Sequence, residues 1–165
     1  MNSLFNGDCL DYMQNDMFVG QADITITSPP YNMNLRIRNG KYCSRQIVKE
    51  LTTKYKNYND NLSMEEYYEW NKKIINYLIQ ISDLVFYNVQ FLTGNKRALF
   101  KLIGEFNEQL KEIIIWNKVN AQPAIGEQIL NSQYEVLLVF NKDNAISRKF
   151  NTAQFDRGTL SNVWD

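Results

Sequence analysis

The apolar positions of the chain change their period along its length, and each change predicts a new element. After Asp8 they recur at helical spacing through residue 17, which predicts a short helix. Residues 23–27 alternate as in a strand, and this strand stops at Ser28-Pro29-Pro30 because proline cannot continue a ladder of hydrogen bonds. Residues 32–62 carry many Asn, Lys, Arg and Tyr side chains without a steady period, which predicts a long loop. In a compact domain such a loop usually has a function.

Two helices are predicted in the middle of the chain. Ser63 and Glu66 form a capping-box pattern, and an apolar stripe at helical spacing follows from Tyr67 to Ile81. A shorter apolar stripe over residues 99–106 predicts the second helix.

Apolar runs at residues 84–88, 113–116 and 136–140 predict three further strands. Strands that alternate with helices indicate an α/β sheet covered on both faces. The last two strands are joined by an irregular stretch with Pro123 and Gly126 instead of a helix. We therefore expect them to form an antiparallel pair at the sheet edge.

The size and composition of the chain are those of one globular domain. Its 165 residues are 44% hydrophobic and 22% charged, and no apolar run approaches the roughly 20 residues that span a membrane. The N-terminus has no signal-peptide pattern, so we expect a cytoplasmic protein without membrane contact. Two cysteines and no histidine disfavour a disulfide framework, a metal site and histidine base chemistry.

Positive charge is concentrated in one segment, although the net charge of the whole chain is zero. Residues 36–58 include seven basic side chains and one acidic side chain, which gives that segment a net charge of +6. Such a segment is typical of a surface that meets the phosphates of nucleic acid. We expect a DNA-contacting loop over about residues 33–62, with these candidate contacts: Arg36, Arg38, Lys41 and Arg45.

The segment Thr27-Ser28-Pro29-Pro30-Tyr31-Asn32 carries the candidate chemistry. Methylation of a base amino group is difficult because the nitrogen lone pair is delocalised into the ring. A site that accepts both amino hydrogens draws the nitrogen towards a tetrahedral geometry, and the hydroxyl of Ser28 and the carbonyl of Pro29 offer two acceptors. The paired prolines restrict the backbone and hold these acceptors in place. Tyr31 can stack on a flipped-out base. The alternatives are a rigid turn after a strand or a short polyproline ligand.

Four segments of the chain together resemble one protein family. Residues 6–10 and 23–32 look like the opening of the permuted, beta-class DNA amino-methyltransferases, in which the catalytic half precedes the cofactor-binding half. Residues 113–118 and 131–140 are similar to later strands of that family. The resemblance implies a Rossmann-like methyltransferase fold that methylates adenine N6 or cytosine N4 in double-stranded DNA, with adenine preferred.

The resemblance also implies roles for individual residues. Ser28, Pro29, Pro30 and Tyr31 would surround the target base, and Asp8 and Ser28 would contact the cofactor S-adenosylmethionine. Asp8 is equally well placed to cap the helix that it opens, and both roles are compatible.

Two further residues near these segments have simpler interpretations. Asn32 favours a turn. Trp116 is expected to be a core residue at a strand end; the alternative is that Trp116-Asn117-Lys118 approaches the target base or DNA.

The glycines of the chain do not form the cofactor turn of this family. Relatives continue into a Phe-x-Gly-x-Gly turn, whereas no two of the seven glycines here lie close enough to form one. Residues 142–165 resemble the segment that leads towards that half. We therefore expect a partial fold without the glycine-rich half. It would be a truncated enzyme, one part of a split enzyme whose second subunit carries that half, a homo-oligomer, or an inactive remnant that binds DNA or a partner. Methylation of RNA or protein is a weaker alternative.

Overall fold

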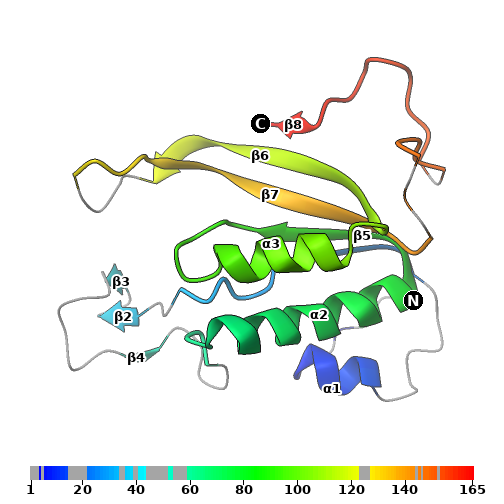
Figure 1. Cartoon of the computed structure of the whole chain (residues 1–165). Coiled ribbons are helices and arrows are strands. Elements are labelled where there is room, and N and C mark those ends of the chain that lie inside the picture. The colour runs from blue at the N-terminus through cyan, green and yellow to red at the C-terminus, as the bar shows by residue number, and fades with distance from the viewer. Residues whose placement is uncertain are drawn as a thin grey trace.

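A five-stranded mixed sheet forms the centre of the computed structural model, with three helices packed against it (Figure 1). The structure describes residues 4, 6–14, 22–33, 36–38, 41–43, 52–53, 59–122, 127–143, 145, 147–151 and 153–165. The strands of this sheet, in spatial order, are β1 (Ala22–Thr27), β5 (Ser82–Val89), β7 (Ser132–Asn141), β6 (Leu110–Gln122) and β8 (Val163–Trp164). β1 is parallel to β5, β7 is antiparallel to both of its neighbours, and β8 is parallel to β6.

The helices lie where the sequence predicts them, although α3 begins three residues before the predicted apolar stripe. They are α1 (Cys9–Gln14), α2 (Met64–Ile81) and α3 (Lys96–Glu105). The capping box of α2 is confirmed, because the backbone N–H of Glu66 donates to Ser63 Oγ and the backbone N–H of Ser63 donates to the Glu66 carboxylate. This reciprocal pair satisfies two N–H groups that a helix start leaves without helical partners.

The main core lies between the sheet and the helices. Buried side chains of α2 and α3 pack against β5 and β7, and Leu10 and Met13 of α1 pack against the same cluster. Tyr67, Leu99 and Leu138 in this core are fully buried. Burial of an aliphatic or aromatic side chain of this size contributes about 1.5–3 kcal/mol, so this layer fixes the position of β5 and β7 against the helices.

The opposite face of the sheet differs from the expectation of two covered faces. Among the described residues no helix covers it. A small apolar cluster lies there, in which Phe86, Leu137 and Phe150 pack against the following buried residues: Leu84, Ile114 and Val139. Ile24 and Ile26 of β1 are 53% and 75% exposed. The apolar runs correctly indicate strands, but they do not reveal which element covers each face.

The antiparallel pairing of the last two predicted strands is confirmed, and both strands are longer than predicted. β6 and β7 pair from Leu110 to Gln122, with register shifts near both ends. Polar residues continue the pairing beyond the apolar runs, so periodicity of apolar positions underestimated their length.

The predicted loop between residues 32 and 62 also contains regular structure, which corrects that prediction. β2 (Arg36–Arg38), β3 (Lys41–Cys43) and β4 (Thr52–Thr53) form a small antiparallel sheet with β2 in its centre. Strands of two or three residues are too short to show an alternating pattern in the sequence.

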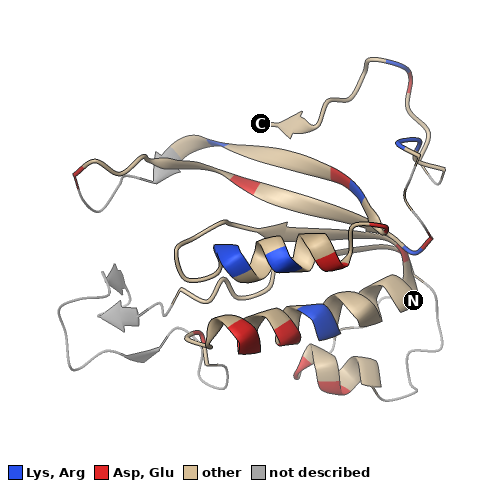
Figure 2. Cartoon of the chain, viewed as in Figure 1, with Lys and Arg blue, Asp and Glu red and all other residues tan. Residues whose placement is uncertain are grey.

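The exposed sides of α2 and α3 carry charges of both signs (Figure 2). Lys72 pairs with Glu105 at 2.6 Å and Lys101 pairs with Glu65 at 2.8 Å, so two ion pairs join these helices. None of the described helices is long and apolar enough to cross a membrane.

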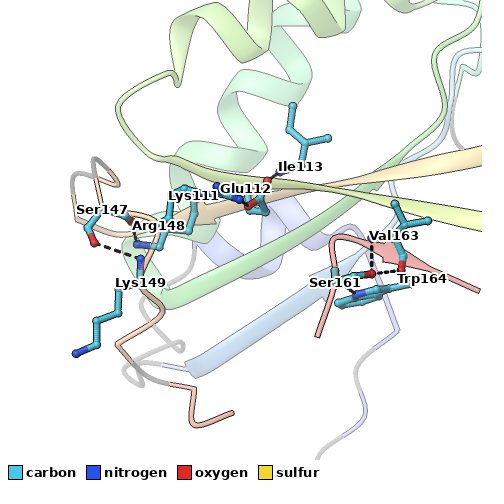
Figure 3. Close-up of polar contacts among 9 residues, drawn as sticks. All are labelled: Lys111, Glu112, Ile113, Ser147, Arg148, Lys149, Ser161, Val163 and Trp164. Carbon is cyan, nitrogen blue, oxygen red and sulfur yellow. Dashed lines mark hydrogen bonds and ion pairs between the residues drawn. The ribbon is translucent and has the colours of Figure 1, made fainter. Parts of the chain in front are cut away.

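Residues of the C-terminal segment attach to the β6 edge of the sheet (Figure 3). The backbone N–H of Ile115 donates to Asn162 O at 2.8 Å. The indole N–H of Trp164 donates to Ser161 O at 2.9 Å, and Ser161 Oγ bonds both backbone groups of Val163. This small turn fixes the Trp164 ring beside β6.

Candidate functional site

Three strand ends meet at the predicted motif. Ser28 follows β1 directly, and the register of β1 with β5 places it beside Asn88 at the carboxyl ends of these parallel strands. β7 runs the opposite way, so Glu135 near its start lies at the same edge. The carboxyl edge of parallel strands is the usual ligand-binding edge of open α/β sheets.

The backbone of the motif is held by side chains from the helix layer. The fully buried Tyr67 of α2 donates its hydroxyl hydrogen to Pro30 O at 2.9 Å. The buried amide of Asn95, which precedes α3, donates to Tyr31 O at 2.8 Å and to Gln90 O at 3.0 Å. The turn is therefore fixed by its surroundings as well as by its prolines.

Asn32 ends the motif in a left-handed conformation, with φ of 56°. Its amide donates to Leu62 O at 2.9 Å and to Gly94 O at 3.2 Å, and its Oδ1 accepts the Leu62 N–H at 2.7 Å. Asparagine tolerates this backbone region better than most residues. The predicted turn role of Asn32 is confirmed, and the residue also ties the motif to two distant segments. Gly94 is required by close packing, because a Cβ there would lie 2.8 Å from Asn32 O.

Five side chains at this edge form a continuous hydrogen-bonded group, which we call the polar cluster: Ser28, Tyr31, Asn88, Lys118 and Glu135. Tyr31 Oη lies 3.0 Å from Ser28 Oγ and donates to Glu135 Oε2 at 2.8 Å. Asn88 Nδ2 donates to Tyr31 Oη at 2.8 Å and to Glu135 Oε2 at 2.7 Å. Lys118 Nζ lies 2.5 Å from Glu135 Oε1.

Glu135 is the negative centre of the polar cluster. Burial by itself would raise the pKa of its carboxyl, but hydrogen bonds from Lys118, Asn88 and Tyr31 outweigh burial and hold the pKa below its ordinary value. Glu135 is therefore ionised at neutral pH. The amide oxygen of Asn88, in contrast, is an unsatisfied acceptor: Oδ1 is buried and accepts no hydrogen bond from the described residues.

A pocket of about 400 Å³ opens beside Ser28. It is lined by Ile26, Thr27, Ser28, Asn88, Trp116, Leu137, Trp164 and Asp165. Trp116 and Trp164 are register partners on β6 and β8, and both indoles are about 40% exposed. The expectation that Trp116 is a core residue is therefore wrong. A polar group beside two flat aromatic side chains suits a planar ligand that carries hydrogen-bond donors.

Two larger hollows lie away from this site. One, of about 670 Å³, lies along the outer side of α2, and the other, of about 730 Å³, lies within residues 148–156. Neither is lined by a residue that the sequence analysis selected. The described residues also contain no group of three metal-binding side chains.

Comparison with known proteins assigns the chain to a family. The family model for DNA methylases of the N6/N4 type matches residues 22–161. The chain belongs to this DNA methylase family. The prediction made from the motif and its flanking segments is thereby confirmed at the level of the family. The chain has no significant match among curated proteins.

The fold of this chain also resembles that of PvuII DNA methyltransferase, which is described as cytosine-N4-specific. The TM-score is 0.52 and the sequence identity 17%, so the similarity supports the fold alone. The match covers 85% of this chain and 49% of the PvuII enzyme, so the methylase chain spans about half the length of that relative. The predicted mixed α/β methyltransferase fold is confirmed.

Asp8 caps a helix, as one interpretation of the sequence predicts. Its Oδ1 accepts the Leu10 N–H at 2.8 Å, and its carbonyl accepts the Tyr12 N–H at 3.1 Å. Asp8 is exposed at the start of α1. Contact between Asp8 and a cofactor stays a prediction.

Three of the four predicted DNA contacts lie on the small sheet. Arg36 and Arg38 lie on β2 and Lys41 lies on β3, with Arg36 opposite Cys43 and Arg38 opposite Lys41. Arg45 lies outside the described residues. Their role in DNA binding stays a prediction.

Three residues of the site were not selected from the sequence: Asn88, Glu135 and Trp164. Glu135 carried a recognisable signal, because it is a charged residue immediately before the apolar run of β7. Asn88 ends the apolar run of β5 in the same way. Lys118 lies in the segment 116–118, for which the sequence offered contact with the base or DNA. Trp164 gave no local signal, because its importance depends on strand pairing.

Proposed function

We propose that this chain is the base-binding part of an S-adenosylmethionine-dependent DNA methyltransferase that methylates the exocyclic amino group of a flipped-out base. The observation that carries the proposal is the polar cluster beside the tryptophan-lined pocket, at the carboxyl ends of β1 and β5. The family match supports the reaction class. Base flipping is the general solution for enzymes that modify a base inside a duplex.

The residues of the pocket suit a base amino group. In the pocket lining, Ser28 Oγ offers one acceptor, and the buried Oδ1 of Asn88 offers another that has no partner among the described residues. The carbonyl of Pro29, a buried residue outside the pocket lining, stays the second acceptor that the motif predicts. An unsatisfied buried acceptor costs about 1–3 kcal/mol, so this edge favours a ligand that donates hydrogen bonds. Trp116 and Trp164 supply flat surfaces on which a base stacks. Tyr31 is held by its hydroxyl, with its ring half-buried beside the pocket edge.

Adenine N6 is our preferred target, ahead of cytosine N4. Both nitrogens present the same two hydrogens to Ser28, so the acceptors do not distinguish them. The two indole rings offer a broad stacking surface, which favours the larger purine ring. The specificity of the PvuII enzyme is not transferred, because 17% identity supports only the fold.

The described residues fit only one part of S-adenosylmethionine. The exposed carboxylate of Asp8 is our candidate for binding the adenine amino group of the cofactor, and the proposal puts the transferable methyl group beside Ser28. When bound, the cofactor supplies an electrophilic methyl group on sulfur. The sequence contains no pair of close glycines for a tight cofactor turn. We therefore propose that a glycine-rich segment outside these 165 residues completes the cofactor site.

The exposed side of β1 is the proposed attachment site for that segment. Among the described residues β1 pairs only with β5, so its other edge is unpaired, and Ile24 and Ile26 beside it are mostly exposed. An unpaired apolar edge is a template for a further strand. This chain matches only about half of the PvuII enzyme. We therefore propose that the partner bound at this edge is a polypeptide with the glycine-rich half rather than a second copy of this chain.

Calorimetric titration of S-adenosylmethionine tests the proposal. The 165-residue chain alone is expected to bind weakly or not at all, and the chain together with a polypeptide that carries the glycine-rich half is expected to bind and to methylate DNA. Ser28→Ala should abolish most methylation, whereas Ser147→Ala, which removes an exposed hydroxyl at a distance from the pocket, should not. Cofactor binding and methylation by the chain alone would contradict the split site, and self-association without cofactor binding would favour a homo-oligomer.

A further inference from the structure

The direction of the hydrogen bonds in the polar cluster follows from its charges. Glu135 is ionised and can only accept. Tyr31 has a single hydroxyl hydrogen, which it donates to Glu135 Oε2 at 2.8 Å. Ser28 Oγ, 3.0 Å from Tyr31 Oη, must therefore donate its own hydrogen to that oxygen. No other described residue hydrogen-bonds Ser28 Oγ, so its lone pairs are available at the pocket that it lines.

We propose that Ser28, Tyr31 and Glu135 form a proton relay that carries the hydrogen released by the methylated amino group to the Glu135 carboxylate. This inference rests on the proposed function. Of these three residues, only Ser28 lines the pocket and contacts the amino group of the base, whereas Glu135 acts through Tyr31. Lys118 and Asn88 orient the Glu135 carboxylate by binding one oxygen each.

The relay balances the atoms and charges of methyl transfer. The amino nitrogen forms a bond to the methyl carbon of S-adenosylmethionine, and the carbon–sulfur bond breaks with its electron pair left on sulfur. The nitrogen then holds a positive charge and one surplus hydrogen. That proton passes to Ser28 Oγ, the serine proton passes to Tyr31 Oη, and the tyrosine proton passes to Glu135 Oε2. Glu135 becomes neutral and later releases its proton to water.

Two physical arguments favour this direction of transfer. A protonated aromatic amine is a far stronger acid than a carboxylic acid, so transfer to Glu135 is downhill even though the hydrogen bonds from Lys118 and Asn88 weaken the carboxylate as a base. The hydrogen bonds from Ser28 to Glu135 also strengthen before proton transfer is complete, because hydrogen bonds that end on a charged group polarise one another. Positive charge that develops on nitrogen is therefore stabilised from a residue that does not touch the base.

Binding of cationic nucleosides tests the relay on the chain itself. The amino groups of 1-methyladenosine and 3-methylcytidine carry part of a positive charge at neutral pH, as the methylated nitrogen does in the reaction, whereas adenosine and cytidine are neutral matched controls. Dissociation constants are measured by tryptophan fluorescence, since Trp116 and Trp164 line the pocket. Because charge-assisted hydrogen bonds are roughly twice as strong as neutral ones, we expect at least one cation to bind about tenfold more tightly than its control.

Glu135→Gln should remove this preference for the cation while binding of the neutral nucleoside persists. Tyr31→Phe, which keeps the ring and the Lys118–Glu135 pair, should remove it as well and decides the outcome if Glu135→Gln does not fold. Glu112→Gln removes a carboxylate on β6 that pairs with Arg148 instead and should keep the preference. A preference that survives in Tyr31→Phe and in any folded Glu135→Gln overturns the relay. The absence of nucleoside binding by the wild-type chain overturns the base pocket and with it the proposed function.

Discussion

Gly94→Ala tests whether the motif is held as tightly as its contacts indicate. A Cβ at this position would lie 2.8 Å from the backbone oxygen of Asn32, well inside van der Waals contact. Asn32 has little freedom to move away, because its side chain makes three hydrogen bonds to Leu62 and Gly94. Overpacking of this kind costs about 1–3 kcal/mol, and we expect Gly94→Ala to lower the free energy of unfolding by that amount.

Urea denaturation followed by circular dichroism measures this effect, and methylation by the completed enzyme measures its consequence. A displacement of about 1 Å in a group that positions a substrate can cost roughly 100-fold in rate. We therefore expect turnover of the variant to fall at the same time as its stability, because Asn32 belongs to the motif that contains Ser28.

Gly104→Ala is the matched control for this prediction. Gly104 lies inside α3, and a Cβ there would meet nothing within 4 Å. Because glycine weakens a helix, alanine should stabilise the chain by about 0.5–1 kcal/mol and leave turnover unchanged. Equal stability of Gly94→Ala and the wild type would refute the argument that Asn32 and Gly94 fix the motif.

Three further predictions concern the chemistry and the partner of the completed enzyme. Ser28→Ala should reduce turnover by roughly 100- to 1000-fold without a change in the thermal melt followed by circular dichroism, because Pro29 and Pro30 still fix the turn; full activity would make this turn structural. Since the pKa of Glu135 is lowered from its ordinary value of 4.5, its contribution to stability is present above that value and lost as the pH falls through the lower folded value. Lys118 and Tyr31 are the described ionisable groups that contact Glu135. The single-turnover rate of methylation should therefore fall only below about pH 4.5, where Glu135 becomes protonated. A fall centred above about pH 5 would contradict the role of Glu135 as the proton acceptor. Neutralisation of Arg36, Arg38 and Lys41 together should reduce the salt dependence of DNA binding by up to about three units of log–log slope, as measured by fluorescence anisotropy; an unchanged slope would place the DNA surface elsewhere.

Local sequence patterns predicted the elements of the fold because their causes are local. The capping box at Ser63 and the apolar stripe after it depend on neighbours three or four positions apart, and both are present in α2. The family was also predictable, because the motif and its flanking strands lie within short segments of the chain. The short strands β2 to β4 were missed, because pairing between distant residues stabilises them and leaves no period in so few positions.

The candidate site was only partly predictable, because contacts between distant residues complete it. Tyr31 and Glu135 are 104 positions apart, and Asn88 and Glu135 are 47 positions apart. Only the order of β1, β5 and β7 in the sheet brings these residues together. The sequence predicted Ser28 and Tyr31 from the chemistry of the motif, whereas the carboxylate that charges the polar cluster becomes visible only in the structure.

Transfer of a labelled methyl group to DNA tests the central claim most directly. The chain is combined with a polypeptide that carries the glycine-rich half, supplied with methyl-labelled S-adenosylmethionine and duplex DNA, and the DNA is digested to nucleosides for chromatography. The polar cluster and its pocket predict that the label appears in N6-methyladenine or, as the second choice, in N4-methylcytosine. They also predict that the Ser28→Ala variant loses this labelling. Label in C5-methylcytosine would contradict the proposed function, because that reaction uses a ring carbon instead of an amino group.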